Sequence, residues 1–259
     1  MRLAFKANFA WMAIGVALVV ALAMVLSAYF SGRQPATVAL DIGFSAIRLL
    51  LPLLIVLLVQ ELLSRELDTR YYLNSLSYPR ARSRLLLGRF AAVLALVLGV
   101  LLAVGLLQVV LIGIIGGAYS QATPVAMGQP YLITIAFMMV DLLVLVVLAT
   151  LLAVVASSPS FVLIGTFGFM LIARSYASII ELLSHDSGLV GNAEGYRAKL
   201  GVLGYLLPNL GALDIRMFAL YGKPEFFPSD WFWLLLSNFS YALALLALAV
   251  WALQRKRLA

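Results

Sequence analysis

The sequence predicts an all-α membrane protein with six transmembrane helices. Three observations support this fold class: 64% of the 259 residues are hydrophobic, only 11% are charged, and the hydrophobic residues form long runs. Soluble domains carry about 25% charged residues, whereas about 20 apolar residues in a helix span the hydrocarbon core of a bilayer. Helices also satisfy their own backbone hydrogen bonds in lipid, and the alternating pattern of barrel strands is absent.

The chain, 1–259, is expected to form a single transmembrane domain. The expected spans are residues 9–30, 40–60, 90–115, 131–156, 161–183 and 231–253. The first run is too long for the core of a signal peptide, so we expect it to be retained as a span. Pro159, flanked by serines, predicts a tight turn between the fourth and fifth spans.

Basic residues predict the orientation of these spans. Six arginines lie within residues 61–89, and other basic residues precede the first span and follow the last. Because Lys and Arg concentrate in cytoplasmic loops, both termini and the 61–89 loop are expected in the cytoplasm. The net charge of +7 is attributed to this bias, and no nucleic acid is expected as a partner. Tyr131, Trp231 and Trp233 lie at the expected outer boundaries, where aromatic rings favour the headgroup layer.

The segment between the fifth and sixth spans contains two further apolar stretches. Residues 200–207 are too short to span and too apolar for a solvated loop, which predicts a re-entrant or interfacial half-helix ended by Pro208. Residues 213–221 predict a second interfacial helix, with Asp214 and Arg216 on its water-facing side.

Motifs for catalysis and for cofactor binding are absent from the sequence. There is no phosphate-binding loop, no GxSxG, no HExxH, no cysteine, and only one histidine, His185. No catalytic, cofactor-binding or metal-binding residue is therefore expected in this chain.

Three charged residues lie well away from the ends of the expected spans: Arg48, Asp141 and Arg174. Asp141 lies 18 residues before Pro159 and Arg174 lies 15 residues after it, so the tight turn places them at similar depth. An ion pair between them is expected, with Arg48 as the alternative partner of Asp141, because a lone charge at the bilayer centre costs at least about 2.5–3.5 kcal/mol. A structural clip between helices is favoured over a substrate or proton path, since one acid does not make a relay.

The loop after the second span has the pattern of a contact element. Glu66 and Arg70 are four residues apart and can pair on one face of a helix, while Tyr72, Leu73 and Leu76 supply an apolar face. Pro79 then ends the helical pattern, and three arginines follow within residues 80–84. A basic flank explains the arginines alone, but not the acidic residues, tyrosines and proline that accompany them.

This loop resembles a motif of ABC type-2 transporter permeases. The matching residues are Glu66, Asp68, Thr69, Arg70, Tyr71, Tyr72, Leu73, Leu76, Ser77, Pro79 and Arg82, followed by LLLGRF at residues 85–90. The resemblance is closest to the branch of the nitrous-oxide reductase maturation permease, against which the order Thr69–Arg70 is reversed. A second resemblance is YLLPNLGALDIR, residues 205–216, which is similar to an outer motif of that branch through Pro208, Asn209, Leu210 and Asp214.

The resemblance implies a permease subunit of an ATP-binding cassette transporter, with export as the expected direction and the bacterial inner membrane as the expected location. It implies a dimer of this chain that binds two copies of a separate ATPase, and that ATPase binds ATP and Mg. The dimer is expected to contact membrane lipid, and the resemblance leaves room for a periplasmic accessory protein as a further partner. The residues expected to dock the ATPase are Glu61, Arg65, Glu66, Asp68, Thr69, Arg70, Tyr72, Leu73, Leu76 and Pro79. The alternatives are a secondary transporter or channel that uses the intramembrane charges, and a membrane scaffold without transport activity.

Overall fold

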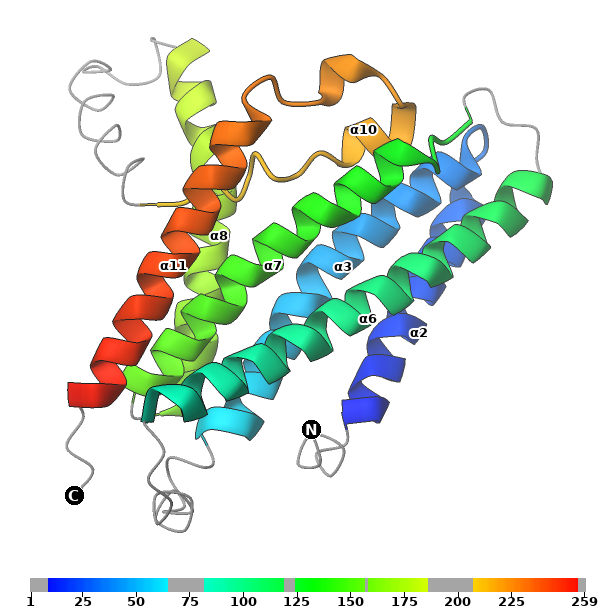
Figure 1. Cartoon of the computed structure of the whole chain (residues 1–259). Coiled ribbons are helices and arrows are strands. Elements are labelled where there is room, and N and C mark those ends of the chain that lie inside the picture. The colour runs from blue at the N-terminus through cyan, green and yellow to red at the C-terminus, as the bar shows by residue number, and fades with distance from the viewer. Residues whose placement is uncertain (1–8, 65–81, 119–123, 157, 186–206, 256–259) are drawn as a thin grey trace.

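A computed structural model describes residues 9–64, 82–118, 124–156, 158–185 and 207–255 of the chain (Figure 1). These parts are helical, and no strand occurs in them. Six of the helices are long and apolar enough to cross a membrane, which confirms the expected all-α fold with six candidate spans. The chain is therefore a multi-pass membrane protein.

The observed helix bounds differ from the expected ones mainly at the first residues of two helices, α3 and α6. The long helices are α2 (Phe9–Phe30), α3 (Pro35–Val59), α6 (Arg82–Ala118), α7 (Gln129–Val155), α8 (Pro159–His185) and α11 (Trp231–Arg255). Helix α3 begins at a proline, whose fixed φ and missing N–H suit a first helical turn. Helix α6 begins in the arginine-rich stretch that was expected to be loop, because long basic side chains can reach water from a helix that continues beyond the hydrocarbon.

Three short elements complete the described structure. Helix α3 continues as a single π-helical turn, η1 (Gln60–Ser64), and the segment before α11 contains α10 (Arg216–Tyr221) and the 3-10 turn η2 (Pro224–Phe226). Gly222 ends α10 with a φ of 66°, a left-handed conformation that glycine adopts without steric cost. Its N–H donates to the carbonyl of Phe218 at 2.9 Å.

Helices α3 and α7 form the centre of the bundle. Helix α3 contacts α2, α6, α7 and α8, while α7 contacts α3, α6, α8 and α11. Large apolar side chains of these two helices, such as Phe44, Leu51 and Leu145, are fully buried. Helices α2, α8 and α11 are mostly exposed and lie at the periphery, where apolar side chains are free to face lipid.

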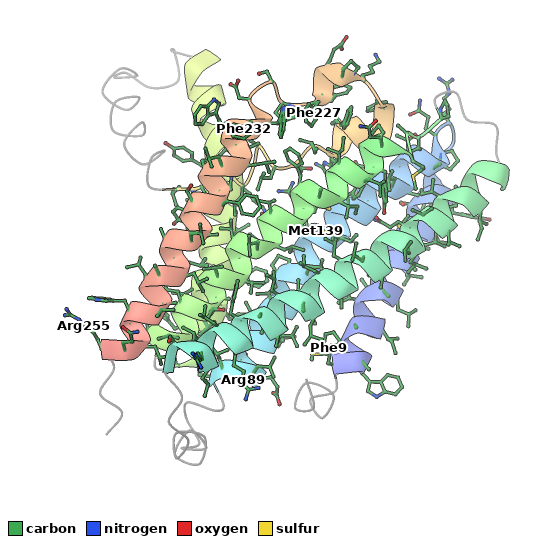
Figure 2. All side chains as sticks on the ribbon, in the orientation of Figure 1. Phe9, Arg89, Met139, Phe227, Phe232 and Arg255 are labelled. Atoms are coloured by element: carbon green, nitrogen blue, oxygen red, sulfur yellow. The ribbon has the colours of Figure 1, made fainter. Side chains whose placement is uncertain are left out.

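The two ends of the bundle differ in character. At the end called here the α10 end, helix α10 lies against the starts of α3 and α7, and Phe227 packs on Phe137 and Phe218 (Figures 1 and 2). At the opposite end α6 begins and α11 ends, and Arg89 and Arg255 lie there (Figure 2). The guanidinium of Arg255 lies 4.6 Å from the centroid of the Trp251 ring.

Tyr131 occupies a different environment from the one expected. Its side chain is 3% exposed, whereas Trp231 and Trp233 are 44% and 67% exposed. Its hydroxyl lies within hydrogen-bonding distance of two acceptors on α6, the carbonyl of Gly105 at 2.8 Å and Oε1 of Gln108 at 3.0 Å. The headgroup-layer position expected for Tyr131 is therefore wrong: the ring stacks on Phe44, and the hydroxyl joins α7 to α6.

Replacing Tyr131 with phenylalanine should weaken this link without changing the fold. We expect Tyr131→Phe to lower the free energy of unfolding by about 0.6 kcal/mol, and by no more than about 1.7 kcal/mol, the range measured for side-chain hydrogen bonds within membranes. The measurement is denaturant unfolding in detergent micelles. Tyr29→Phe is the matched control because Tyr29 is 84% exposed; equal effects of the two changes would contradict the assignment.

Candidate functional site

The candidate site begins on one face of α3. Asp41, Ser45 and Arg48 are spaced by four and three residues, so they lie on the same side of the helix. The Ser45 hydroxyl donates to the carbonyl of Asp41 at 3.0 Å, a bond that keeps this polar side chain satisfied within the helix.

Asp141 on α7 and Arg174 on α8 are in direct contact. Nη2 of Arg174 lies 2.5 Å from Oδ2 of Asp141, and the Asp141 side chain is 3% exposed. Nε of Arg48 lies 3.8 Å from the same oxygen. The ion pair expected from depth is thus present, and Arg48, the alternative partner, is also within reach.

A proline on α3 provides a second contact for Arg174. Pro52 lies inside α3 and has no N–H, so the carbonyl of Arg48, four residues earlier, lacks its usual helical donor. Nη1 of Arg174 donates to that carbonyl at 2.8 Å. In a membrane a carbonyl freed in this way must find another donor, and here the donor is a side chain from a neighbouring helix.

The other side of the Arg48 guanidinium faces the segment before α10. Residues 207–215, called the strap below, return to the bundle with Leu210 and Leu213 buried. Nη1 of Arg48 forms an ion pair with Oδ2 of Asp214, and Nη2 donates to the carbonyl of Leu210 at 3.2 Å. Within the strap, Oδ1 of Asn209 accepts from the N–H of Ala212 at 3.0 Å.

Arg216, at the start of α10, connects the strap back to α3. Its Nε lies 3.5 Å from Oδ2 of Asp214, and its Nη1 lies 3.1 Å from Oδ1 of Asp41 and 2.6 Å from the Ser45 hydroxyl. The interfacial helix expected over residues 213–221 is therefore wrong in two respects. The helix begins only at Arg216, and both charges face α3, because an ion partner is available there.

These six side chains form a row of alternating charge that we call the ion ladder. Its order is Arg174, Asp141, Arg48, Asp214, Arg216, Asp41. Side-chain exposure rises from 3% at Asp141 to 42% at Asp41, so the ladder leads from the interior of the bundle toward the α10 end. Three positive and three negative charges cancel, which removes most of the cost of holding them in a low-dielectric environment.

Two buried atoms of the ladder have no hydrogen-bond partner within the described structure. They are Oδ1 of Asp141 and Nε of Arg174. Buried polar atoms are nearly always satisfied in folded proteins, so this acceptor and this donor at the inner end of the ladder are open to a further partner.

The structure brings only some of the sequence-predicted site residues together. Arg48, Asp141, Arg174 and the motif residues Pro208, Asn209, Leu210 and Asp214 lie in or beside the ladder. Glu61 lies in η1 at the opposite end. The other expected docking residues, Arg65, Glu66, Asp68, Thr69, Arg70, Tyr72, Leu73, Leu76 and Pro79, lie outside the described residues, as do residues 200–206 of the expected half-helix.

Asp41, Ser45 and Arg216 are members of the site that the sequence analysis did not identify. Asp41 and Arg48 share a face of one apolar helix, which was an available signal. In the described parts of the chain, no three His, Cys, Asp or Glu side chains are placed to hold a metal ion.

Comparison with known families identifies the class of protein. The family model described as ABC-2 family transporter protein matches residues 5–173, a range that contains α2, α3, α6, α7 and half of α8. The chain belongs to this family. Neither the curated proteins nor the solved structures gave a significant match. ABC-2 proteins of this kind are in general non-catalytic membrane subunits that work with an ATPase. The strap, Asp214 and Arg216 of this ABC-2 protein lie beyond the matched range.

The contact between Asp141 and Arg174 can be tested with a double-mutant cycle. We expect Asp141→Asn and Arg174→Gln each to lower the free energy of unfolding by about 3 kcal/mol, because each leaves a buried charge without its partner. The double variant should lose clearly less than the sum. Glu225→Gln, an exposed carboxylate on η2, is the control for loss of charge alone. Strictly additive losses would contradict direct contact.

The role of Pro52 can be tested by comparing its replacement in the wild type and in the Arg174→Gln variant. Pro52→Ala restores an N–H that can donate to the carbonyl of Arg48, so it should compensate for the loss of Arg174. We expect Pro52→Ala to be more stabilising in Arg174→Gln than in the wild type by about 1 kcal/mol, the net value of one hydrogen bond. Pro35→Ala, at the first turn of α3, should have the same effect in both backgrounds. Equal effects of Pro52→Ala would contradict the contact.

Proposed function

We propose that this chain is the permease subunit of an ATP-binding cassette transporter. The observation that carries the proposal is the family match over residues 5–173, joined to six candidate spans. We further propose that it works as a homodimer with two copies of a separate ATPase, and that the transport direction is export. The resemblance to the nitrous-oxide reductase maturation branch stays a prediction.

The division of labour between subunits follows from the sequence. ATP hydrolysis in an ATP-binding cassette transporter needs a phosphate-binding loop. The pattern of that loop, GxxxxGK[ST], is absent from all 259 residues. ATP and Mg are therefore assigned to the partner ATPase, and no cofactor is assigned to this chain.

We place the ATPase contact on residues 61–79. Helix α3 leads through η1 directly into this segment, so a force applied there acts on the helix that carries Arg48. The apolar face of Tyr72, Leu73 and Leu76 matches a helix-in-groove contact. Glu66, Asp68 and Arg70 supply a polar rim.

The proposed orientation places the opposite end in the cytoplasm and the α10 end outside. Support comes from Arg84 and Arg89 near the start of α6 and Arg255 at the end of α11, which all lie at the opposite end. This orientation leaves the α10 end free for a periplasmic accessory protein, and the bacterial inner membrane is the proposed location.

A secondary transporter or channel is the second candidate, and the ion ladder is the observation that favours it. Charged residues at membrane depth commonly mark ion or substrate pathways. However, every charge of the ladder has a protein partner of opposite sign, an arrangement that fits a structural connection better than a relay. The ATP-driven permease is therefore preferred, both to this candidate and to a scaffold without transport activity.

The proposal predicts that ATP hydrolysis depends on a second chain. The purified protein should hydrolyse no ATP, and hydrolysis should appear on addition of an ATPase encoded beside it. Phosphate release in nanodiscs is the measurement. Hydrolysis by the purified chain at a rate that does not change when the ATPase subunit is added would contradict the proposal.

A docking variant serves as the matched control for this experiment. Tyr72→Ala combined with Leu73→Ala should abolish co-purification of the ATPase, because truncating large side chains at the centre of an interface typically costs about 2 kcal/mol or more each. Replacing the rim residue Asp68 with Asn should have a smaller effect. Retention of the ATPase by the double variant would show that the contact lies elsewhere.

The orientation can be tested by cysteine labelling in intact cells. Because the native chain contains no cysteine, the background is nil. Cysteines at Arg33 and Lys223 should react with an impermeant thiol reagent, since both positions lie at the α10 end and Lys223 is exposed. A cysteine at Ser75 should react only after the cell membrane is permeabilised. Labelling of Ser75→Cys from outside would reverse the proposed orientation.

A further inference from the structure

Among the described residues, the direct polar contacts between the strap and α3 come from one side chain. Arg48 makes both the ion pair to Asp214 and the hydrogen bond to the carbonyl of Leu210. The other polar contacts between described residues that involve residues 207–214 are local, such as the hydrogen bond from the N–H of Asp214 to the carbonyl of Gly211 at 3.0 Å. Loss of Arg48 from this position would therefore remove the direct charged contact of the strap with α3. The indirect link through Arg216 and the hydrogen bond from Thr134 on α7 to the carbonyl of Ile215 at 3.4 Å would remain.

The strap lies directly against the helix that carries Arg174. A Cβ atom placed on Gly211 would lie 2.5 Å from the carbonyl oxygen of Arg174, a distance that side-chain atoms essentially never reach. Only glycine permits this approach, and the strap must move away from α8 if any side chain is present there. The strap thus lies over the inner end of the ion ladder.

Arg48 has a second position available in which its charge stays paired. Its Nε is already 3.8 Å from Oδ2 of Asp141, and Oδ1 of Asp141 has no hydrogen-bond partner. If Arg48 leaves Asp214, Asp141 can accept it, while Asp214 keeps Arg216 at 3.5 Å. Both arrangements leave every charge with a partner, so the exchange avoids the large cost of an unpaired charge at membrane depth. A side chain in reach of two carboxylates can exchange between them, as the switching elements of proteins do.

We propose that the strap is a gate of the transport pathway, held closed by Arg48 and released when Arg48 shifts from Asp214 to Asp141. The inference rests on the proposed transport function. Helix α3 connects the two ends of the system, because it carries Arg48 and continues through η1 into the segment assigned to the ATPase. Docking or ATP binding at that segment moves α3, changes the partner of Arg48 and frees the strap from α8.

The test uses a single cysteine at Leu213, which is 2% exposed in the closed strap. Its reaction with a soluble thiol reagent reports the fraction of time that the strap is open. In the full-length protein in nanodiscs, Leu213→Cys should react slowly, and adding Arg48→Gln should raise the rate about tenfold or more, because labelling of a buried group follows the open population. Glu225→Gln, which removes an exposed carboxylate on η2 outside the ladder, should leave the rate unchanged.

Two further variants keep the test decisive if Arg48→Gln fails to fold. Asp214→Asn should raise the rate by removing the same ion pair from the other side. Gly211→Ala should raise it by displacing the strap, whereas Gly168→Ala, whose added Cβ meets nothing within 4 Å, should not. A cysteine at Lys223, exposed near α10, should react at the same rate in all backgrounds and controls for reagent access. Equal rates at Leu213→Cys in the wild type and all three strap variants would overturn the proposal.

A labelling experiment on the complex with the ATPase distinguishes failure of the gate proposal from failure of the permease assignment. In the assembled complex, a non-hydrolysable ATP analogue should change the labelling rate of Leu213→Cys, and the Tyr72→Ala, Leu73→Ala variant should abolish the change. A rate that responds to Arg48→Gln but not to nucleotide in a complex that hydrolyses ATP would overturn the gate and leave the permease assignment standing. Failure of any ATPase to assemble would overturn the permease assignment, while the variants of the isolated chain still test the attachment.

Discussion

The arrangement of this protein depends on keeping Arg48 paired inside a membrane domain. Its guanidinium lies between two carboxylates, Asp141 on α7 and Asp214 in the strap, and its carbonyl takes a hydrogen bond from Arg174 because Pro52 supplies none. An unpaired charge at this depth is costly, and so is an unpaired carbonyl. Satisfying one residue therefore fixes the relative positions of α3, α7, α8 and the strap.

The same constraint links the two ends of the molecule. Helix α3 is central in the bundle and carries two side chains of the ion ladder, Asp41 and Arg48. It runs on through η1 toward the segment proposed to dock an ATPase. A long helix transmits displacement as a unit, and α3 contacts α2, α6, α7 and α8. In the proposed permease, α3 would connect the segment assigned to the ATPase with the polar interior of the membrane domain.

Much of the fold could be predicted from the sequence, because lipid leaves an apolar run of about 20 residues few options other than a helix. The Asp141–Arg174 contact also followed, since the short turn at Pro159 equalises their depth. The strap could not be derived, because its return to the bundle depends on a close approach at Gly211 and on partners far away in sequence. Tyr131 was misplaced because an aromatic at a span boundary suits both the headgroup layer and a helix–helix contact.

Hydrogen exchange of the strap amides is the most direct test of the role of Arg48. The N–H groups of Leu210, Ala212 and Asp214 are bonded within the strap, to Pro208, Asn209 and Gly211. In the wild-type protein they should exchange slowly, and in Arg48→Gln they should exchange much faster, while amides in the middle of α7 stay protected. Equal protection of the strap in both proteins, or exchange at unstructured rates in the wild type, would contradict the account.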